Sequence, residues 1–190
     1  VSYHQGVINW EKVKNTGKVD FAIIRCGYGM NEWNETTQTW TQDDPQWEYN
    51  TSECERLNIP YGVYLYSYAD TAEKAKSEAE HVIRMLEGKN LSYPIYYDME
   101  DKSVMNNSKI TAAKASQIAQ TFLNTMKAAG YNNLGVYSSK YYFETKLTAS
   151  LFVVTTACKH NRRQYPYQIF HRHKILQTAC GRSEEHTSEL

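Results

Sequence analysis

Short runs of strand-forming residues alternate with longer amphipathic segments along most of the chain. Strands are predicted at 1–6, 20–26, 59–68, 93–98 and 134–137. Helices are predicted at 10–16, 45–57, 71–87, 111–129 and from 139 onward. Strands that alternate with helices build parallel βαβ units, so the predicted fold class is α/β. The pattern fits a barrel or a doubly wound sheet, but no Gly-x-Gly-x-x-Gly follows a strand, which argues against dinucleotide binding.

The totals exclude several classes of partner. A length of 190 residues suffices for one domain with a sizeable core. The formal net charge of zero gives no reason to expect a nucleic-acid partner. No apolar run approaches the ~18 residues of a membrane helix, so no membrane insertion is expected. The cysteines lack metal-ligand spacing, so no metal site is expected, and a disulfide between Cys26 and Cys54 stays open.

The strand at 93–98 leads directly into three acidic residues, Asp98, Glu100 and Asp101. Side chains two positions apart share a strand face, so Asp98 and Glu100 should project together while Met99 points to the other side. Two neighbouring carboxylates repel each other, and one therefore tends to stay protonated near neutral pH. An acid beside a carboxylate is the pair that glycoside cleavage uses. The alternative is a strand that ends in an acidic, solvated loop, which is the interpretation preferred for Asp101.

Tyrosine is abundant, with 16 residues, and its flat apolar ring with a hydroxyl suits both sugar surfaces and ordinary cores. Tyr64, Tyr66 and Tyr97 are candidates for stacking on sugar or bonding to it, with core packing as the alternative for each. Tyr64 and Tyr66 share one strand face. Arg25 ends an apolar strand, and a buried guanidinium must be paired. It is therefore predicted to orient a site carboxylate or to form a structural ion pair.

Five short motifs lie at 1–10, 21–29, 44–50, 59–64 and 93–100. The fourth reads Ile-Pro-Tyr-Gly-Val-Tyr, and the fifth reads Tyr-Pro-Ile-Tyr-Tyr-Asp-Met-Glu. In this order the five resemble family 25 glycoside hydrolases, the muramidase-type lysozymes. Each motif alone is unspecific, whereas the five in the family's order are specific. The resemblance covers roughly residues 1–145.

The resemblance implies an irregular (β/α) TIM-like barrel. It also implies cleavage of the β-1,4 bond between N-acetylmuramic acid and N-acetylglucosamine in peptidoglycan, without a cofactor or metal. Glu100 is then the general acid that protonates the glycosidic oxygen. Asp98 is the carboxylate that stabilises positive charge at the anomeric carbon, either as a nucleophile or by orienting the substrate's 2-acetamido group. The two carboxyl groups are expected to lie about 5–7 Å apart.

Two features that the resemblance implies are missing from this sequence. Family members usually carry an Asp directly before the Val-Ser of the first strand, where this chain begins with Val1. His4 and Gln5 are candidates to line the cleft near that position. After Leu151 we find neither a Trp-Gln-Tyr-like segment nor a further Asp of the family type. Residues 1–150 are therefore predicted to be a partial barrel, incomplete at the C-terminus and impaired in activity.

The composition changes beyond about residue 150. Residues 145–183 contain no Asp or Glu but seven Lys or Arg. Such a basic segment can bind a polyanion, but we prefer another interpretation. Residues 182–190 match the translation of a common sequencing-adapter start, which predicts a cloning or assembly scar. Residues 151–181 lack periodicity and are interpreted as an aberrant or frameshifted tail.

The function that the sequence favours is a monomeric muramidase that acts on peptidoglycan glycan strands. Because this substrate lies outside the cytoplasm, the protein is expected to be extracellular, associated with the cell wall, or released by a phage at lysis. One alternative is a chitinase-like glycosidase, although those barrels usually carry an Asp where Tyr96 stands. The other is a non-catalytic wall-binding module, which would keep the aromatic cleft without bond cleavage.

Overall fold

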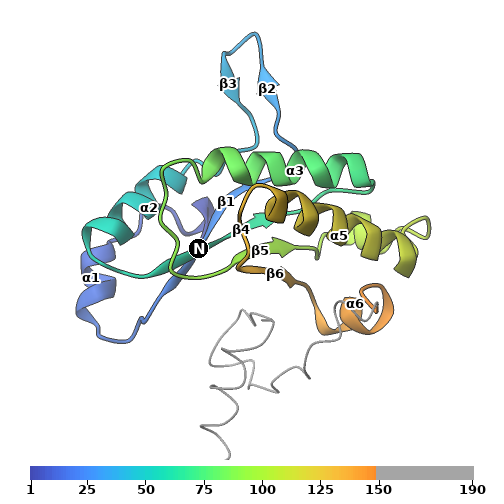
Figure 1. Ribbon diagram of the computed structural model, residues 1–190. Coiled ribbons are helices and arrows are strands. Elements are labelled where there is room, and N and C mark those ends of the chain that lie inside the picture. Colours follow the sequence, from blue (N-terminus) through green and yellow to red (C-terminus); the bar gives the residue numbers. More distant parts are fainter. Residues whose placement is uncertain (149–190) are drawn as a thin grey trace, which may run out of the picture.

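A parallel sheet forms the centre of the protein (Figure 1). The computed structural model describes residues 1–148, so the segments predicted at 151–181 and 182–190 lie outside the described residues. The strand order is β1-β4-β5-β6, and every neighbouring pair is parallel. The strands are β1 (Ala22–Tyr28), β4 (Tyr61–Tyr66), β5 (Ile95–Asp98) and β6 (Leu134–Tyr137). The predicted α/β class is thereby confirmed, while closure into a barrel stays a prediction.

The helices are α1 (Trp10–Asn15), α2 (Trp47–Arg56), α3 (Ala72–Met85), α4 (Lys102–Met105), α5 (Ala112–Ala128) and α6 (Lys140–Thr145). Apolar residues recur at helical spacing in α2, α3 and α5, whereas α4 is too short to show a period. Side-chain caps begin several of them, as at Thr71 and Thr111, whose side chains accept backbone hydrogen bonds. Helices α3 and α5 lie on the same side of the sheet (Figure 1). Within residues 1–148, none of the helices has both the length and the apolar composition required to cross a membrane.

Val1 extends the sheet beside β1. Its amino group donates to the Ile23 carbonyl at 2.8 Å, and its carbonyl accepts from the Arg25 amide at 2.8 Å. These two bonds have the parallel pattern. The chain then turns into a short 3₁₀ helix, η1 (Tyr3–Gln5), so the strand predicted at 1–6 is wrong, and Val1 alone of these residues bonds along β1.

Residues 30–43 lie between the elements predicted from the sequence and were expected to form a loop, but they contain an antiparallel hairpin, so this expectation is wrong. Its strands are β2 (Trp33–Asn34) and β3 (Thr39–Trp40). Strands of two residues are too short to show an alternating apolar pattern, so periodicity could not reveal them. Trp33 and Trp40 pair directly across the strands, with ring centroids 5.2 Å apart. Gln38 adopts a φ of 52° in the turn between them.

The two faces of the parallel sheet differ in chemistry. The helix face, which α3 and α5 cover, carries buried apolar side chains and the ring of Tyr97, stacked on Phe122 with centroids 3.9 Å apart. The opposite face, here called the polar face, carries predicted site residues. In-register neighbours of a parallel sheet share a face, and the register pairs Tyr66 with Asp98 and Arg25 with Tyr64. The fold therefore brings these four residues to one side.

Candidate active site

The C-terminal end of β5 positions the acidic pair. Asp98 is the last residue of the strand, and the Met99 amide continues the pairing by donating to the Tyr137 carbonyl at 2.8 Å. The Met99 side chain is buried in the core, as expected for a residue on the face opposite Asp98. Active sites of (β/α) barrels lie at this end of the strands. The backbone thus delivers Asp98 and then Glu100 to the expected edge of the sheet.

Asp98 is a buried carboxylate with incomplete hydrogen bonding. Its exposed fraction is 5%, and its Oδ1 has no hydrogen-bond partner among residues 1–148. Burial raises the pKa of Asp98 well above its usual value, and the nearby charge of Glu100 raises it further. The positive charge of Arg25 acts in the opposite direction. The pKa of Asp98 therefore depends on the charges of both Glu100 and Arg25.

Glu100 lies half-buried in a pocket of about 440 Å³. Burial raises the pKa of this carboxyl group. A raised pKa keeps the proton on the group closer to neutral pH, which is what a general acid requires. The pocket is lined by Tyr66, Glu100, Asp101, Lys102, Ser139, Tyr141 and Tyr142.

Asp101 is a structural member of this pocket rather than a solvated loop acid. Its Oδ1 accepts from the Ser103 amide at 2.9 Å and the Val104 amide at 3.1 Å, which caps α4. Its Oδ2 accepts from the Tyr66 hydroxyl at 3.3 Å. Asp101 therefore holds Tyr66 in the pocket wall. An Asp directly before a short helix is a capping signal, but four residues of helix are too few for periodicity to reveal.

Arg25 forms the structural ion pair that the sequence left open, and it also acts on Asp98. Its Nε donates to Asp44 Oδ2 at 2.8 Å, and its guanidinium lies 4.9 Å from the Tyr3 ring and 5.4 Å from the Tyr28 ring. Its Nη2 is buried without a hydrogen-bond partner in the described part of the chain. Asp44 directly precedes the helix predicted at 45–57 and begins the family-like stretch at 44–50. Its partner lies 19 positions away, so no local pattern could reveal the pair.

The remaining predicted site residues differ in how far they are buried and in which face of the sheet they occupy. Tyr64 is partly buried on the polar face, where burial raises its pKa to about 12. Gln5 is exposed, and its Oε1 accepts from the Ser2 amide at 2.7 Å as part of a capping box. Tyr97 is fully buried on the helix face, and its hydroxyl donates to Glu78 at 2.5 Å. Tyr97 therefore cannot contact a sugar, and it packs in the core, which was the alternative predicted for it.

Neither the cysteines nor a metal cluster adds chemistry to the described part of the chain. Cys26 and Cys54 are both buried and free, so they do not form a disulfide with each other. Burial raises the pKa of each thiol to about 12, which disfavours the nucleophilic thiolate. In residues 1–148, no group of His, Cys, Asp and Glu side chains is placed to hold a metal ion.

Comparison with known proteins gives a family and several related folds. The model of the glycosyl hydrolases family 25 matches residues 1–158. The modular autolysin LytC from Streptococcus pneumoniae is 38% identical with a TM-score of 0.67, and the match covers 78% of this chain and 33% of LytC. LytC in complex with a synthetic peptidoglycan ligand gives 36% identity, a TM-score of 0.66 and the same coverage of 78% and 33%.

A family 25 glycosyl hydrolase from Bacillus anthracis shares the fold at 15% identity, with a TM-score of 0.63 and coverage of 77% of this chain and 62% of that one. No match was found among curated protein sequences. In the comparison with LytC, the chain spans about a third of the length of that protein.

Proposed function

The chain belongs to the glycosyl hydrolases family 25, and on that premise we propose that it is a peptidoglycan muramidase. The bond cleaved is the β-1,4 linkage between N-acetylmuramic acid and N-acetylglucosamine. LytC, which is 36% identical to this chain, has been solved with a synthetic peptidoglycan ligand, and this supports the substrate class.

The observation that carries the proposal is the placement of Glu100 in a pocket beside a buried second carboxylate, Asp98. In the proposed reaction, Glu100 donates its proton to the glycosidic oxygen as the bond to the leaving sugar breaks. The raised pKa of Glu100 supports this role, because the group then keeps its proton at a pH where a solvent-exposed carboxyl would have lost it.

Asp98 supplies the second function, which is to stabilise the positive charge that develops at the anomeric carbon. It does so as a nucleophile or by orienting the 2-acetamido group of the substrate, and a separation of about 5–7 Å between the carboxyl groups suits both routes. The charge of Arg25, which Asp44 holds in place, favours the ionised form of Asp98. Burial and Glu100 favour the neutral form, so proton sharing between the two acids is part of the proposal.

The proposed substrate determines where the protein acts. Peptidoglycan lies outside the cytoplasm, so the enzyme acts in the extracellular space or at the cell wall, after secretion or release at lysis. We propose that the enzyme is a monomer with a TIM-like barrel fold. It acts on single glycan strands and needs neither a metal nor a cofactor.

The test is an analysis of the products from purified peptidoglycan. After reduction with borohydride, a muramidase yields reduced muramic acid at the new chain ends, whereas a glucosaminidase yields reduced glucosamine. The Glu100→Gln variant is the control for contaminating hydrolases. The proposal fails if the protein yields no new reducing ends, if it prefers chitin, or if Glu100→Gln yields as many ends as the parent.

A further inference from the structure

The hairpin of β2 and β3 carries a pair of exposed tryptophans. The exposed fraction is 40% for Trp33 and 37% for Trp40, and their rings meet at an interplanar angle of 66°. The hairpin projects from the body of the protein, beyond α3 (Figure 1). Large aromatic side chains are usually more buried than this, and a paired exposure indicates a contact surface.

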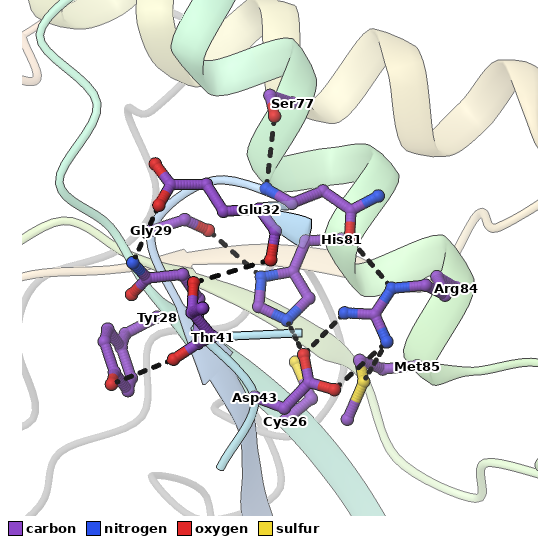
Figure 2. Close-up of polar contacts among 12 residues, drawn as sticks. Cys26, Tyr28, Gly29, Glu32, Thr41, Asp43, Ser77, His81, Arg84 and Met85 are labelled. Atoms are coloured by element: carbon purple, nitrogen blue, oxygen red, sulfur yellow. Dashed lines mark hydrogen bonds and ion pairs between the residues drawn. The ribbon is translucent and has the colours of Figure 1, made fainter. Parts of the chain in front are cut away.

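The hairpin is anchored to α3 by a polar cluster at its base (Figure 2). The Arg84 guanidinium lies 4.0 Å from the centre of the Trp40 ring, which places a cation over one face of the indole. Its Nε donates to Asn31 Oδ1 at 2.8 Å, and its two terminal nitrogens donate to Asp43 at 2.5 and 3.1 Å. Asn31 precedes β2 and Asp43 follows β3, so one side chain ties both ends of the hairpin.

His81 completes this anchor from the same helix (Figure 2). Its Nε2 lies 2.8 Å from Asp43 Oδ1 and its Nδ1 lies 3.1 Å from the Gly29 carbonyl oxygen, with the ring fully buried. Burial alone would raise the pKa of Asp43, but hydrogen bonds from His81 and Arg84 outweigh it and lower that pKa. The carboxylate therefore stays ionised and bonded. Gly27 permits the close approach, because a Cβ there would lie 2.5 Å from His81 Cε1.

A series of aromatic rings connects the candidate pocket with the hairpin. Tyr66 lines the pocket, and its ring centroid lies 5.3 Å from that of Tyr68. Tyr68 lies 6.3 Å from Tyr28, whose hydroxyl donates to the Thr41 carbonyl at 3.5 Å. Thr41 directly follows Trp40 at the end of β3. These contacts lead stepwise from the pocket wall to the base of the hairpin.

The chemistry of the hairpin suits a carbohydrate. Residues 30–42 are rich in Asn, Gln and Thr, whose amides and hydroxyls bond readily to sugar hydroxyls, and they include Glu32 and Glu35 but no Lys or Arg. The absence of basic residues in this segment argues against an anionic membrane or a polyanion as the partner. An indole offers a flat apolar face on which a pyranose ring can stack, with a polar tip at its edge.

We propose that Trp33 and Trp40 form a distal carbohydrate-binding site for a glycan strand whose other part occupies the candidate active site. The site holds sugars away from the bond that is cleaved. Because the anchor fixes the hairpin before binding, less conformational entropy is lost when the strand binds. This inference rests on the proposed function, since it takes the same glycan as its ligand.

The test measures equilibrium binding in the full chain carrying Glu100→Gln, which prevents turnover. The ligands are purified peptidoglycan glycan strands, either long or cut to two disaccharide units. We expect the double substitution Trp33→Ala and Trp40→Ala to weaken binding of long strands roughly tenfold, which corresponds to about 1.4 kcal/mol. Affinity for the short fragments should change less than about twofold, because a short fragment bound in the pocket does not reach the tryptophans that are removed.

Two further variants separate a binding role from a folding defect. Trp40→Tyr keeps an aromatic face and should recover most of the affinity for long strands. Tyr49→Ala removes an aromatic residue of similar exposure, 36%, from α2, and should have no effect on either ligand. The inference is overturned if the double variant binds long strands as tightly as its background, if both ligand lengths weaken equally, or if Tyr49→Ala weakens binding as much.

The test distinguishes a failure of this inference from a failure of the proposed function. If the parent chain yields no new reducing ends, the muramidase proposal fails, yet the comparison of long and short strands in the Glu100→Gln background still decides whether the hairpin binds glycan. Loss of long-strand binding together with normal cleavage by the parent supports both proposals.

Discussion

Each face of the central sheet contacts a buried carboxylate, and the two carboxylates have opposite surroundings. On the helix face, Glu78 of α3 accepts hydrogen bonds from the Ser67 hydroxyl at 2.8 Å, the Tyr97 hydroxyl at 2.5 Å and the Tyr68 amide at 2.8 Å. On the polar face, Asp98 is similarly buried, yet its Oδ1 has no hydrogen-bond partner in the described residues. A buried charge without full hydrogen bonding is costly to the folded state.

The difference shows how stability and chemistry are divided in this fold. Glu78 joins α3 to the ends of β4 and β5, so its hydrogen bonds are expected to stabilise the protein. Asp98 destabilises it, and its unsatisfied oxygen and raised pKa suit a group that must interact with substrate. The residues on the polar face should therefore control activity, and those on the helix face should control the free energy of unfolding.

The largest expected effect is that of Glu100→Gln on turnover. Removing a general acid should lower kcat on peptidoglycan by roughly 10²–10⁴-fold. The thermal unfolding midpoint should stay the same, because within residues 1–148 Glu100 makes no hydrogen bond that holds secondary structure together. Initial rates and calorimetry on the same preparations check both parts. A variant that is slow only because it is partly unfolded would break the comparison.

Asp98→Asn should separate activity from stability most clearly. The rate should fall about 10²–10³-fold, because a neutral amide no longer stabilises the developing positive charge. The free energy of unfolding should rise, since the buried position no longer holds an ionisable carboxyl. Urea denaturation at neutral pH measures the second effect. A clear loss of stability would mean that Asp98 is a structural residue like Glu78.

Glu78→Ala should lower the free energy of unfolding and leave activity nearly unchanged, which is the opposite of the effects of Asp98→Asn. Three donors on the helix face lose their acceptor, and the free energy of unfolding should fall by roughly 3 kcal/mol. Glu78→Gln is the control, because its amide oxygen still accepts and the loss should be smaller. Specific activity per folded molecule should remain within a few-fold of the parent, measured at a temperature well below unfolding. A selective loss of kcat in Glu78→Gln would place this residue in the reaction.

A smaller effect is expected from pH. Burial raises the pKa of Asp98 and of Glu78 in the folded protein, so the folded state binds these protons more tightly than the unfolded state. This stabilisation is fully present below the unfolded pKa of about 4 and is lost as pH rises through the raised folded values. Urea denaturation across pH 4–8 should show a decline with rising pH that is shallower in Asp98→Asn. An unchanged slope would show that Asp98 has a normal pKa.

The smallest effects compare two tyrosines on opposite faces. Tyr97→Phe removes one hydrogen bond to Glu78 and should cost about 1 kcal/mol of unfolding free energy, with KM unchanged. Tyr66→Phe removes the bond to Asp101 at the pocket and should raise KM with little change in stability. Steady-state kinetics on soluble glycan strands distinguish them. An increase of KM in Tyr97→Phe would return this residue to the list of sugar contacts.

Much of this division could be predicted from the sequence, because alternation along strands is a local property. The spacing of Asp98 and Glu100 placed the acids at a strand end, and the same alternation placed Tyr97 on the other face from Asp98, a signal that should have removed it from the sugar candidates. The apolar stripes of α3 and α5 were equally visible. Local periodicity could not reveal the contacts between segments that are distant in the sequence.

Three such contacts determine the site and its surroundings. Arg25 pairs with Asp44, and Tyr66 bonds to Asp101. Glu78, buried on α3, accepts hydrogen bonds from Ser67, Tyr68 and Tyr97. A glutamate in a helix is most often solvated, so only the positions of Ser67 and Tyr97 in space reveal its role. The hairpin was missed for a different reason, because its strands are only two residues long.

The most direct test of the account is the rate at which purified peptidoglycan gains new muramic acid reducing ends. This rate is measured for the parent, Glu100→Gln, Asp98→Asn and Glu78→Gln, each corrected for its folded fraction. We predict that the parent and Glu78→Gln cleave at rates within a few-fold of each other, while the rates of both polar-face variants fall at least about a hundredfold. Cleavage by Glu100→Gln as fast as by the parent, or a fall in the rate of Glu78→Gln together with the polar-face variants, would contradict this division of roles.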